Sequence, residues 1–370
     1  MSGLKDRLVY RENRVLGMLE RLSACRHPIG LIGGGTYART LCEALPRFGI
    51  TPSFIVLDEK YMNKSGMTIC SLPVISPGEC ASRCPDAHLI IAYNYRHENE
   101  LTVIKKEMLK FTPDTYIYAL GTVFLNELDW MPYEYILGNI TGFEETYDML
   151  EDALSQRIMA EFLNARISGD AGMMHVFDGD SDNDYDPDLL FGNDRKGVIV
   201  ECGAFDGKSA LQTDEYFSGS RKIYALEPVG AAFEKMCRSV SGHKSIIPIK
   251  KGTGDKECAA YISGSDGTAA VSENGSGERI EITTIDALLG DETAAVITMD
   301  IEGSEVSALK GAKNVIIRDH PALAVRIYHK CDDLLTIPKL IESLSGGGYK
   351  YYLRINNPNI GTYDVTLYAV

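Results

Sequence analysis

Short apolar runs alternate with amphipathic stretches along most of the chain, and several of the runs end in a glycine turn or an acid. The clearest run is Val198-Ile-Val200, which leads through Glu201, Gly203 and Gly207 into a segment that begins as a helix. A buried strand that passes through a glycine turn into a helix is how an α/β sheet builds a nucleotide pocket at its carboxyl edge. The pattern therefore predicts a parallel sheet with a ligand site beside these residues.

The same alternation of strand and helix patterns continues to the end of the chain, which indicates a doubly wound parallel sheet. The next strand ends in Glu227, and a later one ends in Asp300. The two final extended runs predict a terminal antiparallel hairpin. We expect strands at 223–228, 245–249, 295–300, 322–328, 349–355 and 366–370, short extended pieces over 258–282, and helices at 283–289, 304–317 and 337–344.

The first part of the chain has its own set of strands and helices. A helical pattern over 4–26 precedes a strand that enters a Gly-x-Gly-x-x-Ala turn at Gly33 and Gly35, and the next strand ends at Asp58. Further strands are predicted near 73–75, 88–92 and 116–119. We therefore expect a smaller Rossmann-like domain that binds a nucleotide or nucleotide-sugar at Gly33, Gly35 and Asp58, or that serves as a docking or dimerisation module.

A helical linker and an acidic loop are expected between the two halves. Residues 143–167 form one long helical pattern, and an acidic run follows over 178–186. A calcium loop would need a glycine after Asp184 and a glutamate six residues beyond it, so we expect a solvated acidic loop instead. The predicted division is 1–120 for the N-terminal domain, 121–190 for the linker and 191–370 for the second domain.

Composition and charge narrow the classes of function. The chain has 370 residues, which favours two domains, and a net charge of −15, which argues against nucleic acid and anionic membranes as partners. No apolar stretch is long enough to span a membrane and no signal peptide is apparent. The nine scattered cysteines indicate free thiols in a reducing cytoplasm. A homo-oligomer is compatible with all of these features.

The acids at the strand ends point to a particular cofactor. A carboxylate at Glu201 suits a cationic ligand without phosphate, such as S-adenosylmethionine, better than a pyrophosphate. We expect Glu201, Gly203 and Gly207 to approach its methionine end and Glu227 its ribose hydroxyls. Asp300 is expected beside the reactive methyl group, where the alternative role is a cap for the next helix.

Three further motifs lie in the second half: 297–305, 321–330, and the pair 349–354 and 366–370. In order and spacing they resemble the FkbM family of S-adenosylmethionine-dependent methyltransferases, and the resemblance covers roughly residues 196–370. Glu201 stands where that family more often has Asp, and Ile355-Asn-Asn replaces a His-containing continuation. The resemblance implies a class I methyltransferase sheet and O-methylation of a sugar hydroxyl on a polysaccharide or glycoconjugate precursor. The N-terminal domain resembles the nucleotide-binding domain of sugar acyltransferases.

Three side chains are expected to meet beside the methyl group: Asp300, Glu302 and His329. We predict a general base and its orienting partner, with His329 as the base and no metal. The alternatives are a structural hydrogen-bond cluster and a divalent cation that binds a diol. For the whole chain, the alternative functions are a non-catalytic nucleotide or nucleotide-sugar binding module and an N- or C-methyltransferase of a small metabolite.

Overall fold

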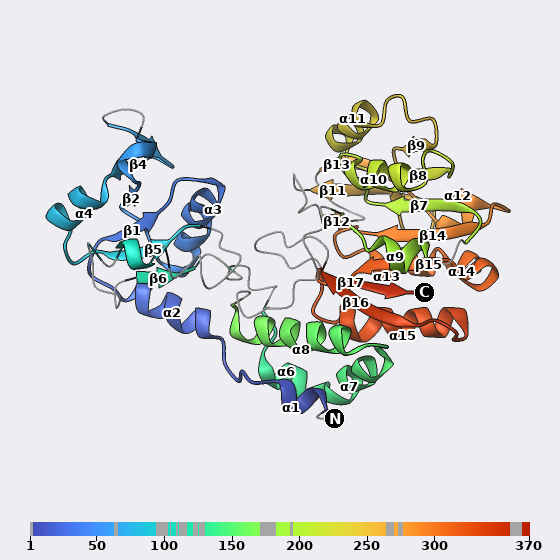
Figure 1. The fold of residues 1–370 in the computed structure, drawn as a ribbon, viewed down its shortest axis with the longest axis horizontal. Helices are drawn as coiled ribbons and strands as arrows, with labels where there is room; N and C mark the ends of the chain where they lie inside the picture. The colour runs from blue at the N-terminus through green and yellow to red at the C-terminus, as the bar shows by residue number, and fades with distance from the viewer. Residues whose placement is uncertain are drawn as a thin grey trace.

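A computed structural model gives the arrangement of most of the chain, as two lobes that each contain a sheet (Figure 1). Part of the acidic run over 178–186 lies outside the described residues, so the calcium-loop alternative is untested. Among the described residues, no helix is both long and apolar enough to cross a membrane. The described residues are 3–62, 66–93, 103, 105–108, 110, 117–120, 125, 130–170, 183–192, 195–263, 270–272, 277–355 and 365–370.

The first lobe contains a six-stranded sheet in the order β3-β4-β2-β1-β5-β6. Its strands are parallel except for β3, which pairs antiparallel with β4. The expected strands are therefore present, and the Rossmann-like character of this domain stays a prediction. The strands are β1 Ile29–Ile32, β2 Phe54–Val56, β3 Thr68–Ile69, β4 Leu72–Ile75, β5 His88–Ile91 and β6 Ile117–Ala119.

The second lobe contains a seven-stranded sheet in the order β16-β17-β15-β14-β7-β8-β9. β17 runs antiparallel to both β15 and β16, and the other neighbouring strands are parallel. This arrangement is the expected parallel α/β sheet, and it confirms the expected terminal hairpin. The strands are β7 Val198–Cys202, β8 Ile223–Leu226, β9 Ile246–Ile249, β14 Ala294–Met299, β15 Ala322–Arg326, β16 Tyr351–Ile355 and β17 Val365–Ala369.

A separate four-stranded sheet, in the order β10-β13-β11-β12, follows β9 in the chain. Its apolar side chains form a small cluster of their own beside Val229. This sheet accounts for the extended pieces expected over 258–282 and places them beside the ends of β7 and β8 (Figure 1). The strands are β10 Gly252–Thr253, β11 Cys258–Ser263, β12 Ala270–Ser272 and β13 Glu278–Thr283.

Three helical patterns that read as continuous are interrupted in the structure. The pattern over 4–26 is two helices, and the patterns over 143–167 and 304–317 are each divided as well. Within 143–167, Asp152 caps the start of the second helix by accepting a hydrogen bond from the Ser155 N–H at 2.7 Å. The helices are α1 Leu4–Arg7, α2 Arg14–Ser23, α3 Thr36–Ala44, α4 Pro77–Arg83, α6 Tyr133–Gly138, α7 Ile140–Met149, α8 Ala153–Ser168, α9 Pro187–Phe191, α10 Lys208–Tyr216, α11 Gly230–Ser239, α12 Ile285–Leu289, α13 Glu305–Lys310, α14 Lys313–Asp319 and α15 Asp333–Ser345, with 3₁₀ turns η1 Leu45–Phe48 and η2 Glu59–Tyr61.

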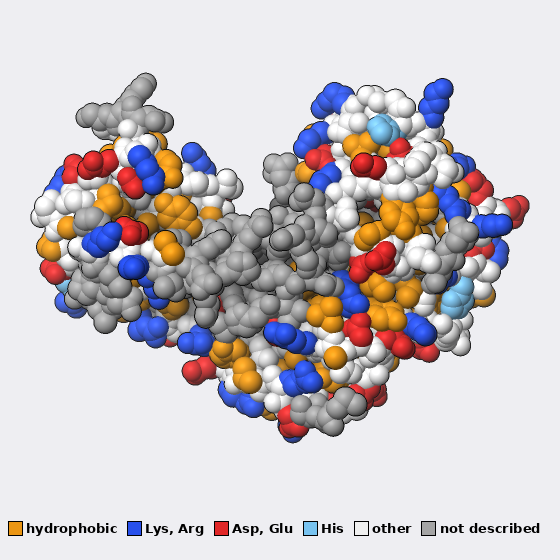
Figure 2. Space-filling model, in the orientation of Figure 1, with side chains coloured by type: hydrophobic (Ala, Val, Ile, Leu, Met, Phe, Trp, Pro, Cys, Tyr) orange, Lys and Arg blue, Asp and Glu red, His pale blue; other side chains and the backbone are white. Residues whose placement is uncertain are grey.

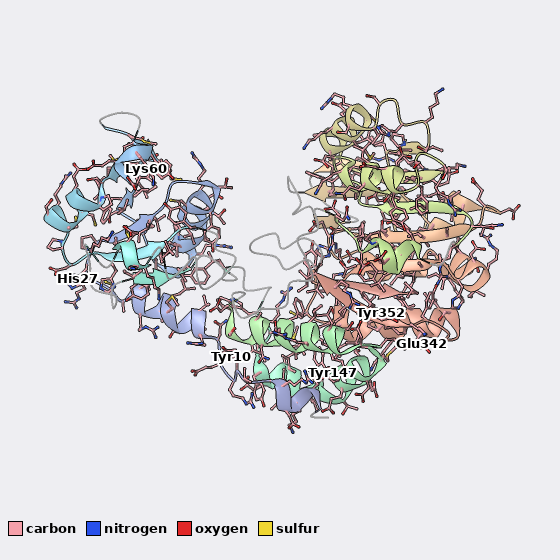
Figure 3. The ribbon with its side chains drawn as sticks, viewed as in Figure 1. Tyr10, His27, Lys60, Tyr147, Glu342 and Tyr352 are labelled. Atoms are coloured by element: carbon pink, nitrogen blue, oxygen red, sulfur yellow. The ribbon has the colours of Figure 1, made fainter. Side chains whose placement is uncertain are left out.

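The helices expected to form a linker share one hydrophobic core with the second sheet. Leu4 and Leu8, at the start of the chain, belong to the same buried cluster as Phe162 of α8 and Leu367 of β17. Asn164 joins these parts, since its amide donates to the Arg7 carbonyl at 2.9 Å. In Figure 3, Tyr10 and Tyr147 lie beside these helices and Lys60 lies in the other lobe. The division at residue 190 stays a prediction, but the packing favours a second domain that includes α1 and α6–α8.

Candidate active site

A cavity of about 1150 Å³ lies at the carboxyl edge of the second sheet, between the ends of β7, β8, β14 and β15 and the four-stranded sheet. The carboxyl ends of parallel strands are where open α/β sheets bind ligands, because the loops there diverge from a common edge. Four predicted site residues line this cavity, namely Gly203, Glu227, Asp300 and Glu302. Glu201, Gly207 and His329 lie close behind its wall.

Glu201 is buried at the end of β7, and one of its carboxylate oxygens, Oε2, has no hydrogen-bond partner among the described residues. The Ser209 hydroxyl hydrogen-bonds to the carboxyl group, but burial dominates and raises the pKa of Glu201 to about 8. The unsatisfied oxygen means that Glu201 retains the capacity to bind one further donor.

This burial has a consequence for stability. Between about pH 5 and pH 8 the native state holds a proton on Glu201 that the unfolded chain has released, so stability should fall as pH rises. Relative to a Glu201→Gln variant, the ligand-free protein should lose about 1–4 kcal/mol over this range. Denaturant melts of both proteins at several pH values measure the difference. The exposed control Glu12→Gln should run parallel to the wild type, and a wild-type curve parallel to Glu201→Gln would refute the assignment.

The two predicted glycines both have a left-handed backbone and both lie against other parts of the second lobe. Gly203 has φ +84°, and a Cβ there would lie 1.9 Å from the Asp300 carbonyl oxygen, so its lack of a side chain lets β7 approach the end of β14. Gly207 has φ +83°, and a Cβ there would meet Val240 and Met236 of the neighbouring helix. The lack of a side chain at Gly207 therefore clears α11, and its expected approach to the methionine end of the cofactor stays a prediction.

Glu227 lies at the end of β8 and is buried against the cavity. Its Oε2 accepts the Phe205 N–H at 3.0 Å and its Oε1 accepts the Val229 N–H at 2.8 Å. Burial raises its pKa, and these two hydrogen bonds oppose that rise. Each oxygen keeps a free lone pair, so the carboxylate can still accept hydroxyl groups while the two loops hold it in place.

Asp300 follows β14 and faces the cavity with a side chain that is 30% exposed. Its Oδ2 lies 3.5 Å from Arg326 Nε, and its Oδ1 accepts a hydrogen bond from the Tyr328 hydroxyl at 3.4 Å. Glu302 is not in extended geometry, since its φ is +53°. This left-handed turn, rather than strand alternation, brings its carboxylate to the same side as Asp300.

His329 follows β15 and is nearly enclosed, with a side chain that is 8% exposed. Its Nδ1 lies 3.0 Å from Oε1 of Glu305, which is itself buried and accepts the Ile301 N–H at 3.1 Å. Burial lowers the pKa of His329, but the carboxylates of Glu305, Asp300 and Glu302 outweigh it and raise that pKa. His329 does not line the cavity, so a direct contact between this ring and an acceptor does not fit its placement.

Several residues that line the cavity were not predicted from the sequence to be site residues. Phe205 has φ +46° and projects from the glycine turn, and Arg326 extends beneath Tyr185 at 5.1 Å. Arg326 also donates to the Asp184 carbonyl at 3.1 Å. Glu305, the buried partner of His329, was named in the sequence analysis only as part of the motif 297–305. A sequence shows such residues as ordinary helix or strand positions, so only the fold reveals them.

The N-terminal candidates are less well arranged for a ligand. Gly33 has φ +116° and lies close to the Ala92 carbonyl, whereas a Cβ on Gly35 would meet nothing within 4 Å. The Asp58 carboxylate lies 3.3 Å from Lys60 Nζ and accepts the N–H of the same lysine. Binding of a nucleotide or nucleotide-sugar at Gly33, Gly35 and Asp58 stays a prediction.

Comparison with known proteins supports the interpretation of the second lobe. The family model described as Methyltransferase FkbM domain matches residues 201–351. A crystal structure of methyltransferase FkbM from Methylobacillus flagellatus is similar over 100% of this chain and 94% of its own, with a TM-score of 0.72 and 21% identity. No curated protein has a sequence that matches this one.

Two further solved structures are similar over about half of the chain. Fibrillarin from Aeropyrum pernix, in complex with S-adenosyl-L-methionine, covers 48% of this chain and 67% of its own, with 13% identity and a TM-score of 0.30. An rRNA methylase from Streptococcus thermophilus covers 47% and 86%, with 14% identity and the same TM-score. The fold assignment therefore depends on the M. flagellatus structure. The FkbM family model matches residues 201–351, which are less than half of the chain.

Proposed function

We propose that this protein is an S-adenosylmethionine-dependent O-methyltransferase that acts on a sugar hydroxyl of a polysaccharide or glycoconjugate precursor. The observation that carries the proposal is the continuous cavity that extends from Glu227 to Asp300 at the carboxyl edge of the sheet. Its volume exceeds the range of about 300–1,000 Å³ that is usual for one small ligand. The site therefore has room for a cofactor and an acceptor together.

The described residues fit S-adenosylmethionine, which would supply a methyl group on a sulfonium. Glu227 offers two oxygens for the ribose hydroxyls, and Ala260, Ile280 and Ile282 offer an apolar wall for the adenine. Asp300 and Glu302 place negative charge at the far end of the cavity, where the cationic sulfonium would lie. We therefore retain Glu201, Gly203, Gly207, Glu227 and Asp300 as the proposed cofactor residues.

The chain's contribution to methyl transfer is mainly positioning. Methyl transfer neutralises the positive charge of the sulfonium, so no oxyanion needs stabilising. Holding donor and acceptor about 3–3.5 Å apart therefore supplies most of the acceleration. The hydroxyl must also lose its proton. Asp300 and Glu302 face the cavity and are the groups placed to receive it, whereas His329 holds both carboxylates from behind. We propose His329 as a positioning residue and not as the base that contacts the acceptor.

The acceptor class is supported by the rim of the cavity. Lys208, Lys235, Arg238 and Lys251 line it in a chain whose net charge is −15. Each of the four pairs with a nearby acid: Lys208 and Lys235 with aspartates at 3.3 and 3.0 Å, and Lys251 and Arg238 with glutamates at 3.9 and 4.0 Å. A local gathering of cations suits a polar acceptor that carries phosphate, such as a nucleotide-sugar. On the face shown in Figure 2, acidic and basic side chains are otherwise interspersed.

Calorimetric titration with S-adenosylmethionine, followed by a product assay on a panel of nucleotide-sugars, tests the proposal. We expect saturable binding and a new methyl ether on a sugar oxygen. Absence of binding would favour the non-catalytic binding module. Methylation of nitrogen or carbon would favour the alternative of a small-metabolite methyltransferase.

A Glu227→Ala variant should bind S-adenosylmethionine about 10- to 100-fold more weakly, because it loses charge-assisted hydrogen bonds worth about 1.5–3 kcal/mol. Calorimetry measures the affinity, and a thermal melt checks that the loops held by Glu227 remain folded. Glu278→Ala is the matched control: its carboxylate accepts the Gly230 N–H at 3.1 Å but does not line the cavity. Unchanged affinity in Glu227→Ala would move the ribose site elsewhere.

A further inference from the structure

Asp300, Glu302 and His329 surround a gap that their own hydrogen bonds do not fill. One potential ligand atom of each lies within 4.8 Å of the other two. His329 Nε2 is 3.5 Å from Asp300 Oδ1 and 3.7 Å from Glu302 Oε2. Hydrogen bonds of this kind are shorter, about 2.7–3.2 Å. Neighbouring ligands that share a cation at about 2.1 Å lie about 3.0–3.4 Å apart, which is close to the observed spacing.

The orientation of the His329 ring adds an independent observation. Glu305 Oε1 lies 3.0 Å from Nδ1 and is buried, so it favours a proton on that nitrogen. With the proton on Nδ1 alone, Nε2 would direct a lone pair toward two carboxylates, and neither ring nitrogen has a hydrogen bond of standard geometry among the described residues. A lone pair facing two anions is unfavourable unless positive charge lies between them. Histidines that ligate metals are typically held in this way, with the other ring nitrogen directed at a carboxylate.

We propose that Asp300, Glu302 and His329 bind one divalent cation, with Glu305 orienting the histidine and the remaining coordination positions open to the cavity. One imidazole and two carboxylates suit Mn²⁺ or Zn²⁺ better than Mg²⁺, which prefers a site made of oxygens alone. Arg326 and Tyr328 contact Asp300 and fix its orientation. Lys330 is directed elsewhere, since its ammonium donates to the Gly303 carbonyl.

The catalytic consequence rests on the proposed function. A cation at this position would bind the acceptor hydroxyl oxygen and make its proton more acidic. The O–H bond would break, with the proton passing to a carboxylate or to water. The oxygen lone pair would form the O–CH₃ bond as the S–CH₃ bond of the cofactor breaks. The products are the methyl ether, S-adenosylhomocysteine and a proton.

Titration of the full-length protein with MnCl₂, followed by electron paramagnetic resonance of free Mn²⁺, tests the site directly. We expect one Mn²⁺ per chain, with affinity at least tenfold weaker in Glu302→Gln and His329→Gln and about 10- to 100-fold weaker in Glu305→Gln. Glu302 is exposed, so its variant keeps the test valid if the buried variants fail to fold. Asp255→Asn, which alters another acid that lines the cavity, should bind Mn²⁺ as the wild type does.

Two outcomes would overturn the inference: no binding at about 1 mM Mn²⁺, or binding that all three variants leave unchanged. In the first case a proton on Nε2 supplies the positive charge, and in the second the ion is bound elsewhere. Calorimetry with S-adenosylmethionine in EDTA separates this inference from the proposed function. Cofactor binding without Mn²⁺ binding refutes the metal site alone, and Mn²⁺ binding without cofactor binding refutes the proposed function alone.

Discussion

An Asp300→Asn variant should lose about 10²–10⁴-fold in kcat, the usual contribution of a group that moves a proton in the transition state. Asparagine keeps the size of the side chain but removes its charge. The carboxylate lies between Arg326 and His329 and faces the cavity, so its loss affects both proton removal and the orientation of its neighbours. Cofactor affinity should fall as well, but by a smaller factor, because only one of the anions near the sulfonium is removed.

Steady-state kinetics with the identified acceptor and calorimetry with S-adenosylmethionine provide the two measurements. Asp255→Asn is the matched control, because Asp255 lines the same cavity without joining the cluster around His329. Its kcat should stay within a few-fold of the wild type. If Asp300→Asn turns over at the wild-type rate, the acceptor lies away from the end of β14 and the proposed chemistry is wrong.

A Gly203→Ala variant should be destabilised by about 4 kcal/mol or more, which is exceptional for one methyl group. The left-handed conformation alone costs about 1–2 kcal/mol for a residue with a Cβ. The rest arises because the new Cβ would lie 1.9 Å from the Asp300 carbonyl oxygen, so either β7 or the end of β14 must move. The movement would also displace the turn at Gly203, which we propose contacts S-adenosylmethionine, and abolish binding of this cofactor.

Gly242→Ala separates the two contributions in a chemical denaturation experiment. Gly242 has φ +101°, and a Cβ there would meet nothing within 4 Å, so this variant measures the conformational cost without the clash. We expect it to be destabilised by about 1–2 kcal/mol. Equal destabilisation of the two variants would mean that β7 and β14 tolerate the extra atom.

The alternation of apolar runs and helices was enough to predict the parallel sheet and its terminal hairpin, because buried strands carry a strong local pattern. The interrupted helices depend on contacts that the pattern does not contain. Gly311, for example, separates α13 from α14 where a Cβ would lie 1.9 Å from the Gly254 carbonyl oxygen. Hydrophobic periodicity alone has no means of indicating such a distant backbone neighbour.

The acids of the candidate site were predicted because strand ends gather at one edge of a parallel sheet. How deeply each side chain is buried was not predicted, because sequence position does not reveal which side chain lies in front of another. His329 was therefore predicted to be the base, whereas in the structure it lies behind Asp300 and beside Glu305. Glu302 reached the cluster by a left-handed turn that its residue type does not favour.

The position of Leu4 and Leu8 has a consequence for synthesis on the ribosome. These residues are made before the lobe containing β1–β6, yet they belong to a core that Val365, Leu367 and Ala369 complete. Contacts between such distant parts of a chain form slowly, because a large loop must close before they contribute. The N-terminal segment therefore stays unfolded at first, with its leucines exposed to chaperones, while the lobe containing β1–β6 can already fold. Residues made before that lobe would therefore reach their native positions after it.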